Sequence, residues 1–311
     1  MLNLFNFCNA RIRDKIEICE QKEGKNMIAK CKVGLVLEGG GMRGAFTAGV
    51  LDYFLDKNLS FHTCIGVSAG ACHACSFLSK QRRRGFETNT DYLEDETYCS
   101  FKNLMKTGDL FGVDMCYRKI PEELNPYDYQ AFSENPTEFY VVVTNCKTGE
   151  AEYKKITDMH RGIHYVRASS SLPLLSRTVW IKNTPYLDGG IADSIPVKQS
   201  EKLGNHKQVV VLTRQRGYRK EPNKAMPAAY LRYQREFPKL VARMKNRHLD
   251  YNAALDYLYE EEKKGNVFLI VRKNLWKSAE LKKIGKNWSV VRKKATLQQK
   301  KLGSALLDFM K

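Results

Sequence analysis

The segment VGLVLEGGGMRGAF, residues Val33–Phe46, carries a clear structural pattern. Its opening run, VGLVL, is apolar throughout, which is typical of a strand buried on both faces. Three consecutive glycines follow, and from Arg43 onward small and apolar residues favour a helix. A strand, a glycine loop and a helix in this order predict the first unit of an α/β fold.

The same alternation continues beyond this unit. We expect a helix over Arg43–Leu55, a strand over His62–Val67 and a second helix over Ala69–Leu78. This order implies a parallel sheet with helices on its faces. Further strands are expected within Glu138–Cys146, Ala151–Ile156, Val179–Asn183, Gln208–Thr213 and Asn266–Arg272, with a hairpin turn in CKTGE between the first two.

The glycines also fit the spacing of the dinucleotide-binding fingerprint. Gly39, Gly41 and Gly44 are separated by one residue and then by two. That fold needs an acidic residue at the end of its second strand, where it accepts the ribose hydroxyls. Here the second strand ends in GVSAG, so Ser68 occupies the place, and Asp52 falls on the preceding helix. A nucleotide site is therefore not expected.

The GVSAG segment, Gly66–Gly70, has the pattern of a nucleophile elbow. Small residues on both sides of the serine allow a strained turn between strand and helix, and this turn lifts the hydroxyl clear of the backbone. The helix that follows adds the partial positive charge of its N-terminus. Ser68 is therefore the candidate nucleophile.

A serine that attacks an ester creates an oxyanion, which needs hydrogen-bond donors fixed in advance. Backbone amides of Gly39, Gly40 and Gly41 are the candidate donors, because glycine lets a substrate approach the main chain closely. Arg43 adds a cation beside the same loop. The loop is thus the candidate oxyanion hole.

The base for Ser68 is sought among histidines and carboxylates. A histidine after the acid would complete a Ser–His–Asp triad, but His206 lies where a strand begins and His248 lies in a charged, helix-like stretch. The segment YLDGGIADSIPV offers Asp188 before two glycines, with Asp193 as the second choice. A buried carboxylate with a raised pKa can take the serine proton directly, so Asp188 is the candidate base.

With EGGGMRG, GVSAG and DGG in this order, the sequence resembles the patatin-like phospholipase family of lipid acyl hydrolases over roughly Lys32–Val197. The segment ASSSLPLLS before YLDGG is similar to the approach to the acid in bacterial members. The resemblance implies a Ser68–Asp188 dyad, with Gly39–Gly41 and Arg43 as its oxyanion hole. It also implies a three-layer α/β/α sandwich with a mainly parallel central sheet, a phospholipid or other fatty-acyl ester as substrate, and no metal or organic cofactor.

Charge divides the chain unevenly. Residues 1–200 carry 25 Lys and Arg against 24 Asp and Glu, whereas residues 201–311 carry 27 against 10, a net charge of +17. We expect an N-terminal tail over residues 1–26, a catalytic region over 27–200, and a basic region over 201–311 that continues the same fold. Such an excess attracts anionic surfaces, so peripheral association with anionic membranes is a candidate role. The candidate contacts are Arg214, Arg216, Arg219, Lys220, Lys282, Lys283, Arg292, Lys293 and Lys294, with Tyr218 as an interfacial anchor.

Composition and motif content indicate the expected cellular location and exclude some kinds of site. The N-terminal residues lack the pattern of a secretory signal, the apolar runs are too short to span a bilayer, and the nine cysteines are scattered, so we expect reduced thiols and a cytoplasmic protein. The CHAC pair, Cys72 and Cys75, lacks the partners that a zinc site needs. No sequence-specific nucleic-acid binding is expected, because aromatic residues do not alternate with the basic ones. A non-catalytic basic module for phosphorylated ligands or nucleic acid, or a non-lipid esterase, stays an alternative.

Overall fold

The computed structural model describes residues 32–272 and 303–310. Its strands are β1 (Val33–Leu37), β2 (Thr63–Val67), β3 (Glu138–Asn145), β4 (Ala151–Ile156), β5 (Val179–Ile181), β6 (Thr184–Asp188), β7 (Lys207–Leu212) and β8 (Val267–Val271). Its helices are α2 (Gly44–Asp56), α3 (Ala69–Leu78), α4 (Arg84–Thr90), α5 (Phe101–Thr107), α6 (Tyr129–Ser133), α7 (Met159–Ser169), α8 (Val197–Lys202), α9 (Met226–Tyr233) and α10 (Pro238–Lys263). Three short helical segments are η1 (Gly41–Arg43), η2 (Met115–Leu124) and η3 (Gly189–Ile191), and residues 303–310 form a further helix.

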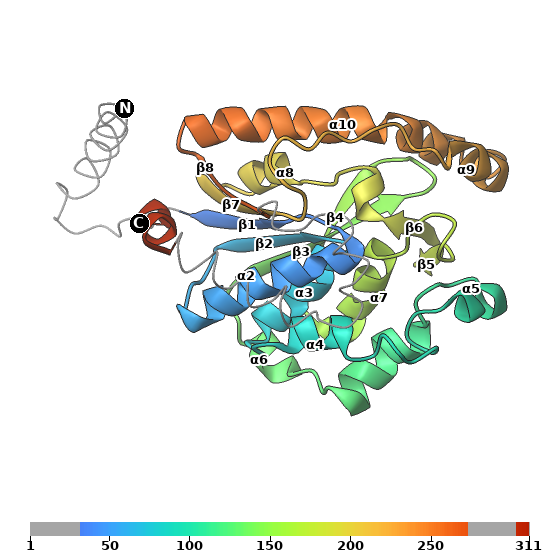
Figure 1. The fold of residues 1–311 in the computed structure, drawn as a ribbon, viewed down its shortest axis with the longest axis horizontal. Coiled ribbons are helices and arrows are strands. Elements are labelled where there is room, and N and C mark those ends of the chain that lie inside the picture. Colours follow the sequence, from blue (N-terminus) through green and yellow to red (C-terminus); the bar gives the residue numbers. More distant parts are fainter. Residues whose placement is uncertain (1–31, 273–302, 311) are drawn as a thin grey trace.

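The strands form one sheet in the order β5-β6-β3-β2-β1-β7-β8, with β4 paired to β3. The neighbouring pairs among β3, β2, β1, β7 and β8 are parallel, whereas β4, β5 and β6 pair antiparallel. Helices α2, α3, α4, α6 and α7 lie on one face, and α8 and α10 on the other (Figure 1). The predicted three-layer α/β/α sandwich with a mainly parallel sheet is confirmed.

Alternate residues of the central strands serve the two helical layers. In β1, Leu35 and Leu37 pack in the cluster that includes α2 and α3, whereas Val36 packs with α10 residues. The same alternation separates Val209 from Val210 in β7. A strand with buried neighbours on both faces has to be apolar along its whole length, which explains why VGLVL and VVVL lack a polar face.

The antiparallel part of the sheet brings two strand ends together beside β3. Val67, at the end of β2, pairs with Val142, and Asp188, at the end of β6, pairs with Val143. Because β4 occupies the other edge of β3 along these residues, β2 and β6 share one edge and meet end to end. The residue after β2 is Ser68, so the register of β3 brings it next to Asp188.

The strands before Asp188 differ from the expectation. The segment predicted as one strand, VWIKN, contains a short strand and a turn, and a separate strand, β6, leads into Asp188. The turn consists of Lys182 and Asn183, both of which have positive φ.

Two helices of the C-terminal part pack on the edge of the sheet. The 26-residue helix α10 packs over β7 and β8. The helix at 303–310 packs through Phe309 against Phe268 of β8.

The predicted divisions of the chain stay predictions. The tail over residues 1–26 lies outside the described residues, as do the candidate membrane contacts Lys282, Lys283, Arg292, Lys293 and Lys294. Within residues 32–272 and 303–310, no helix is long and apolar enough to cross a membrane.

Candidate active site

A direct hydrogen bond joins the two residues that the sequence singled out. Ser68 Oγ donates to Asp188 Oδ2 at 2.7 Å, although the residues are 120 positions apart in the chain. Ser68 is 8% exposed and Asp188 is 2% exposed, so the pair is shielded from bulk water. A hydroxyl that already donates to a buried carboxylate is arranged to lose its proton to that carboxylate.

Ser68 stands on a strained turn between β2 and α3. Its φ is 54° and its ψ is −125°, a conformation that a residue with a side chain rarely adopts. The turn closes tightly, since a Cβ at Gly70 would lie 2.4 Å from the carbonyl oxygen of Leu37. Ser169, at the end of α7, fixes the turn from the other side: its Oγ accepts from Ser68 N at 2.8 Å and donates to Val142 O at 2.6 Å.

The Asp188 carboxylate is held at both oxygens. Oδ2 accepts from Ser68, and Oδ1 accepts from the amide of Gly190 at 2.7 Å. Burial raises the pKa of the Asp188 carboxyl above its ordinary value, while Arg247 and the hydrogen bonds from Ser68 and Gly190 act in the opposite direction. A carboxylate with a raised pKa binds a proton more readily, which suits a base.

The glycine loop lies directly against the serine. A Cβ at Gly39 would be 2.9 Å from Ser68 Cβ, so a side chain there would push the loop away. The amides of Gly39 and Gly40 donate no hydrogen bond within the described part of the chain. Arg43 is half-buried at the end of η1. Of the predicted oxyanion-hole residues, Gly39 thus lies against Ser68 and Gly41 lines the same cavity as Ser68, whereas Gly40 lies against Thr213.

Glu38, which precedes the glycines, anchors the loop from behind. Its Oε2 accepts from Thr213 N at 2.6 Å and from Thr213 Oγ1 at 2.9 Å, and its Oε1 accepts from Tyr251 OH at 2.7 Å. Thr213 Oγ1 also lies 3.0 Å from Gly39 O. The loop is therefore fixed to the end of β7 and to α10 before any substrate arrives.

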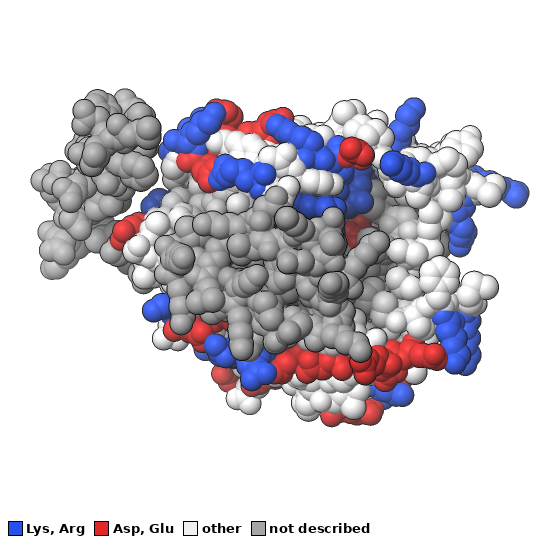
Figure 2. Space-filling model, in the orientation of Figure 1, with Lys and Arg blue, Asp and Glu red and all other residues white. Residues whose placement is uncertain are grey.

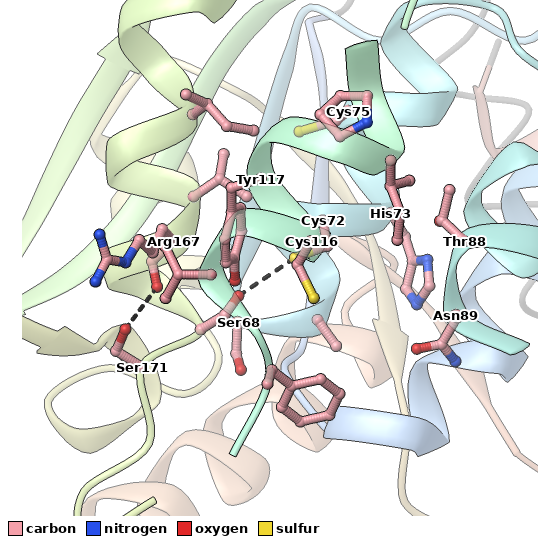
Figure 3. Close-up of a pocket in the computed structure, with 18 of the residues that line it drawn as sticks. Ser68, Cys72, His73, Cys75, Thr88, Asn89, Cys116, Tyr117, Arg167 and Ser171 are labelled. Carbon is pink, nitrogen blue, oxygen red and sulfur yellow. Dashed lines mark hydrogen bonds between the residues drawn. The ribbon is translucent and has the colours of Figure 1, made fainter. Parts of the chain in front are cut away.

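A cavity of about 170 Å³ opens at Ser68 and runs along α3. Ser68, Cys72 and Tyr117 lie together in it, and Cys72 Sγ lies 3.3 Å from Ser170 Oγ (Figure 3). Its lining away from the serine is largely apolar, with Phe111, Ile120, Tyr127, Met159, Ile163 and Val166. The cavity can therefore hold a long apolar group whose carbonyl lies at Ser68.

Within the described residues, no side chain of the rejected alternatives forms a hydrogen bond with Ser68 or Asp188. None of the six histidines, all of which are described, hydrogen-bonds to Ser68 or Asp188. Burial lowers the pKa of His73 to about 4, and its ring packs against Gly44. Asp193 accepts a hydrogen bond from Tyr153 at 2.7 Å instead. Cys72 and Cys75 both lie on α3, and no group of three metal-binding side chains occurs among the described residues.

The sequence analysis missed several supporting residues. Ser169 belongs to the ASSSLPLLS segment, whose likeness to bacterial relatives was the available signal. Thr213, Tyr251 and Arg247 gave no local signal, because each lies far along the chain from the partner that it contacts. Arg247 Nε donates to Gly190 O and so supports the turn beside Asp188.

Comparison with known proteins agrees with this geometry. Residues 35–200 match the family model described as Patatin-like phospholipase. Similar proteins include "Uncharacterized protein YjjU" of Escherichia coli, 29% identical over 58% of this chain and 52% of that protein. They also include "Lysophospholipase nte1" of Emericella nidulans, 29% identical over 55% of this chain and 11% of that protein, and "Probable lipid hydrolase 463L" of Invertebrate iridescent virus 6, 24% identical over 56% and 64%. The chain thus spans about half the length of the bacterial relative and a small part of the fungal one.

The family model matches more than half of the chain, and the matched residues include the glycine loop, Ser68 and Asp188. The chain therefore belongs to the patatin-like phospholipase family.

Proposed function

We propose that this protein is a serine lipid acyl hydrolase that cleaves the fatty-acyl ester of a phospholipid, a lysophospholipid or a related lipid. The hydrogen bond of 2.7 Å between Ser68 Oγ and Asp188 Oδ2 supports this proposal most directly. Membership of the family and the names of the lysophospholipase and lipid hydrolase relatives support the substrate class.

The reaction runs through an acyl-enzyme. Asp188 Oδ2 takes the proton of Ser68 as Oγ attacks the ester carbonyl, and the amides of Gly39 and Gly40 receive the oxyanion with the charge of Arg43 nearby. The leaving alcohol takes the proton from Asp188 as the ester bond breaks. A water molecule then gives a proton to Asp188 and attacks the acyl-enzyme. As the bond from the acyl carbon to Ser68 Oγ breaks, this proton passes from Asp188 to Oγ, which releases the fatty acid and restores the serine and the carboxylate.

The cavity along α3 holds the acyl chain during these steps. Its apolar lining begins beside the serine, so a chain that enters it presents its carbonyl to Ser68. Burial of each methylene contributes about 0.8 kcal/mol, which favours fatty-acyl over short-chain esters.

A panel of lipid esters tests the proposal. We expect turnover by the wild type and a loss of at least about a thousandfold in the Ser68→Ala variant, since the substitution removes the proposed nucleophile. A fluorophosphonate probe should label the wild type and not the variant. Equal turnover or equal labelling of the two proteins would refute the assignment of Ser68.

A further part of the proposal is that the basic C-terminal region associates peripherally with anionic membrane surfaces. Its support is the net charge of +17 over residues 201–311. Two of the candidate contacts are engaged at the surface, since Arg216 pairs with Glu262 and Arg219 with Asp256. These ion pairs leave the remaining basic residues as the source of any membrane attraction.

A further inference from the structure

Five basic residues that form no ion pair with any described residue lie at the end of the sheet that holds the site. Arg43, Arg214 and Arg272 follow β1, β7 and β8, which are three neighbouring parallel strands. The carboxyl ends of such strands meet at one edge, so their side chains converge there. Lys220 and Arg247 join them from the loop after β7 and from α10. We call these five residues the cation cluster.

Contacts connect the cation cluster to the dyad. Arg247 Nε donates to Gly190 O, and the amide of Gly190 donates to Asp188. Lys220 Nζ lies 4.3 Å from the ring centre of Tyr251, whose hydroxyl bonds to Glu38 before the glycine loop. The Arg214 guanidinium lies 4.3 Å from the ring centre of Tyr218, which packs edge-on against Tyr251 at 6.0 Å.

Within residues 32–272 and 303–310, no acidic side chain forms an ion pair with the cation cluster. Its five members are all half-buried, and none forms an ion pair within the described residues, in contrast to Arg216, Arg219 and Arg243. The two nearby carboxylates already serve other groups: Glu38 accepts from Thr213 and Tyr251, and Asp188 accepts from Ser68 and Gly190. Arg43 Nε and Arg272 Nε are buried and have no hydrogen-bond partner in the part of the chain that is described.

Burial and the neighbouring positive charges lower the pKa values of members of the cation cluster. Burial lowers the pKa of Lys220 to about 8, and Arg247, Arg214 and Arg43 act in the same direction against Glu38. Burial and Arg214 also lower the pKa of Arg272. Lys and Arg side chains gather beneath the N-terminal half of α10 on the face shown in Figure 2. Buried donors and uncompensated positive charge are the chemistry of an anion site.

We propose that the cation cluster is a phosphate-binding subsite that selects acyl esters with an anionic phosphate headgroup over zwitterionic and neutral ones. The proposal rests on the proposed function. Four of its five residues lie beyond the segment that matches the family model, so the subsite is a feature of this chain's own C-terminal part. The acyl chain occupies the cavity along α3, the phosphate binds the cation cluster, and Ser68 lies between them. A choline or ethanolamine cation is disfavoured, because the rings of Tyr218 and Tyr251 already carry Arg214 and Lys220.

Three esters with one oleoyl chain test the selectivity: lysophosphatidic acid, lysophosphatidylcholine and monooleoylglycerol, each in the same neutral detergent micelle. We expect the wild-type kcat/KM to be highest for lysophosphatidic acid, by about tenfold or more over monooleoylglycerol. In an Arg214→Gln/Arg272→Gln double variant this ratio falls towards one. An Arg216→Gln/Arg219→Gln variant, altered in the same loop but outside the cation cluster, keeps the wild-type ratio. Equal wild-type rates on the three esters, or a double variant that retains the preference, would overturn the proposal.

Binding to the inactive Ser68→Ala protein tests the phosphate subsite without requiring turnover, so its outcome does not depend on the proposed hydrolysis. The choice of ligands distinguishes a lipid phosphate from free phosphate. Calorimetry with inorganic phosphate, glycerol 3-phosphate and lysophosphatidic acid should give the tightest binding for the lipid, weakened about tenfold or more in the Ser68→Ala/Arg214→Gln/Arg272→Gln protein. Inorganic phosphate that bound as tightly as the lipid would refute the headgroup assignment. In the absence of phosphate, the double substitution should leave the melting temperature unchanged or raise it, because it relieves repulsion; a marked fall would assign these arginines a structural role instead.

Discussion

Ser68 contacts a carboxylate, Asp188, where many serine hydrolases place an imidazole. Asp188 lies directly against Ser68 and is more than nine-tenths buried, so water does not compete for the serine proton. The raised pKa of the carboxyl compensates in part for the weak basicity of an ordinary aspartate. Two partners, Ser68 and Gly190, keep both carboxylate oxygens oriented.

Substitution of Asp188 by Asn should abolish turnover and leave the fold intact. Asparagine keeps the shape and can accept from Gly190, but it cannot take the serine proton. The folded carboxyl binds its proton more tightly than the unfolded one, so the wild type loses stability as the pH rises through the interval between the two pKa values. The variant lacks this cost, and its melting temperature at pH 7 should equal or exceed that of the wild type. Protonated Asp188 cannot act as a base, and its pKa lies above the ordinary aspartate value of about 3.9. Wild-type kcat/KM should therefore decrease as the pH is lowered, with a midpoint above that value.

Variants of the late histidines provide the control. His248→Ala and His206→Ala should retain most of the wild-type turnover, because neither ring contacts the dyad. Loss of activity in either one, with unchanged thermal unfolding, would indicate a triad.

At the scale of elements, β3 sets the distance between nucleophile and base. The ends of β2 and β6 pair with adjacent residues of β3, Val142 and Val143, and Ser169 at the end of α7 binds the same stretch. Ser169 is fully buried and satisfies one backbone donor and one backbone acceptor. It is a positioning residue, since it acts on the reaction only through Ser68.

A Ser169→Ala variant should be less stable by about 1–3 kcal/mol, because it leaves the Ser68 amide and the Val142 carbonyl without their partner. Its kcat should fall about tenfold or more while KM changes little, since the serine shifts and the acyl cavity does not. Ser79→Ala is the matched control: this serine is equally buried and bonds to Ser76 O at the far end of α3. The control should lose stability with kcat preserved. A Ser169→Ala protein with wild-type kcat would reduce the residue to a structural role.

Sequence patterns predicted those elements whose apolar period is strong and local. The strand and helix bounds from Val33 to Leu78 agree with the structure to within a residue or two, because fully buried strands and glycine turns leave a direct mark on composition. The separate strand β6 was missed, since it is short and contains Pro185. The cation cluster and the contacts of Glu38 depend on strand order and on α10, which no local pattern reveals.

At the scale of the whole molecule, charge and catalysis occupy different stretches of one chain. The segment that matches the family carries the serine, the aspartate and the loop, while residues 201–311 carry nearly all of the net charge of +18. Strands β7 and β8 and helix α10 nevertheless complete the sheet and its outer layer around the site. Residues 201–272, the part of the basic region that supplies these elements, thus belong to the same scaffold as the candidate site.

Sedimentation with lipid vesicles tests that attraction. We expect the bound fraction to rise with the proportion of anionic lipid at low salt, and to fall sharply at about 0.5 M salt, where screening shortens the range of the charges to a few ångströms. Vesicles of neutral lipid serve as the control and should bind little protein. Binding that ignored both lipid charge and salt would leave the basic residues as a solvated surface.

On the proposed mechanism, the meeting of β2 and β6 beside β3 also sets the stage of synthesis at which activity can arise. A growing polypeptide carries the nucleophile early, but the carboxylate arrives 120 residues later and needs its own strand to dock before it reaches the hydroxyl. An incomplete or misfolded product therefore has a serine without a base. On the proposed mechanism, a chain in which β6 has not docked cannot hydrolyse lipid esters, so recovered hydrolysis in a refolding experiment reports completion of this part of the sheet.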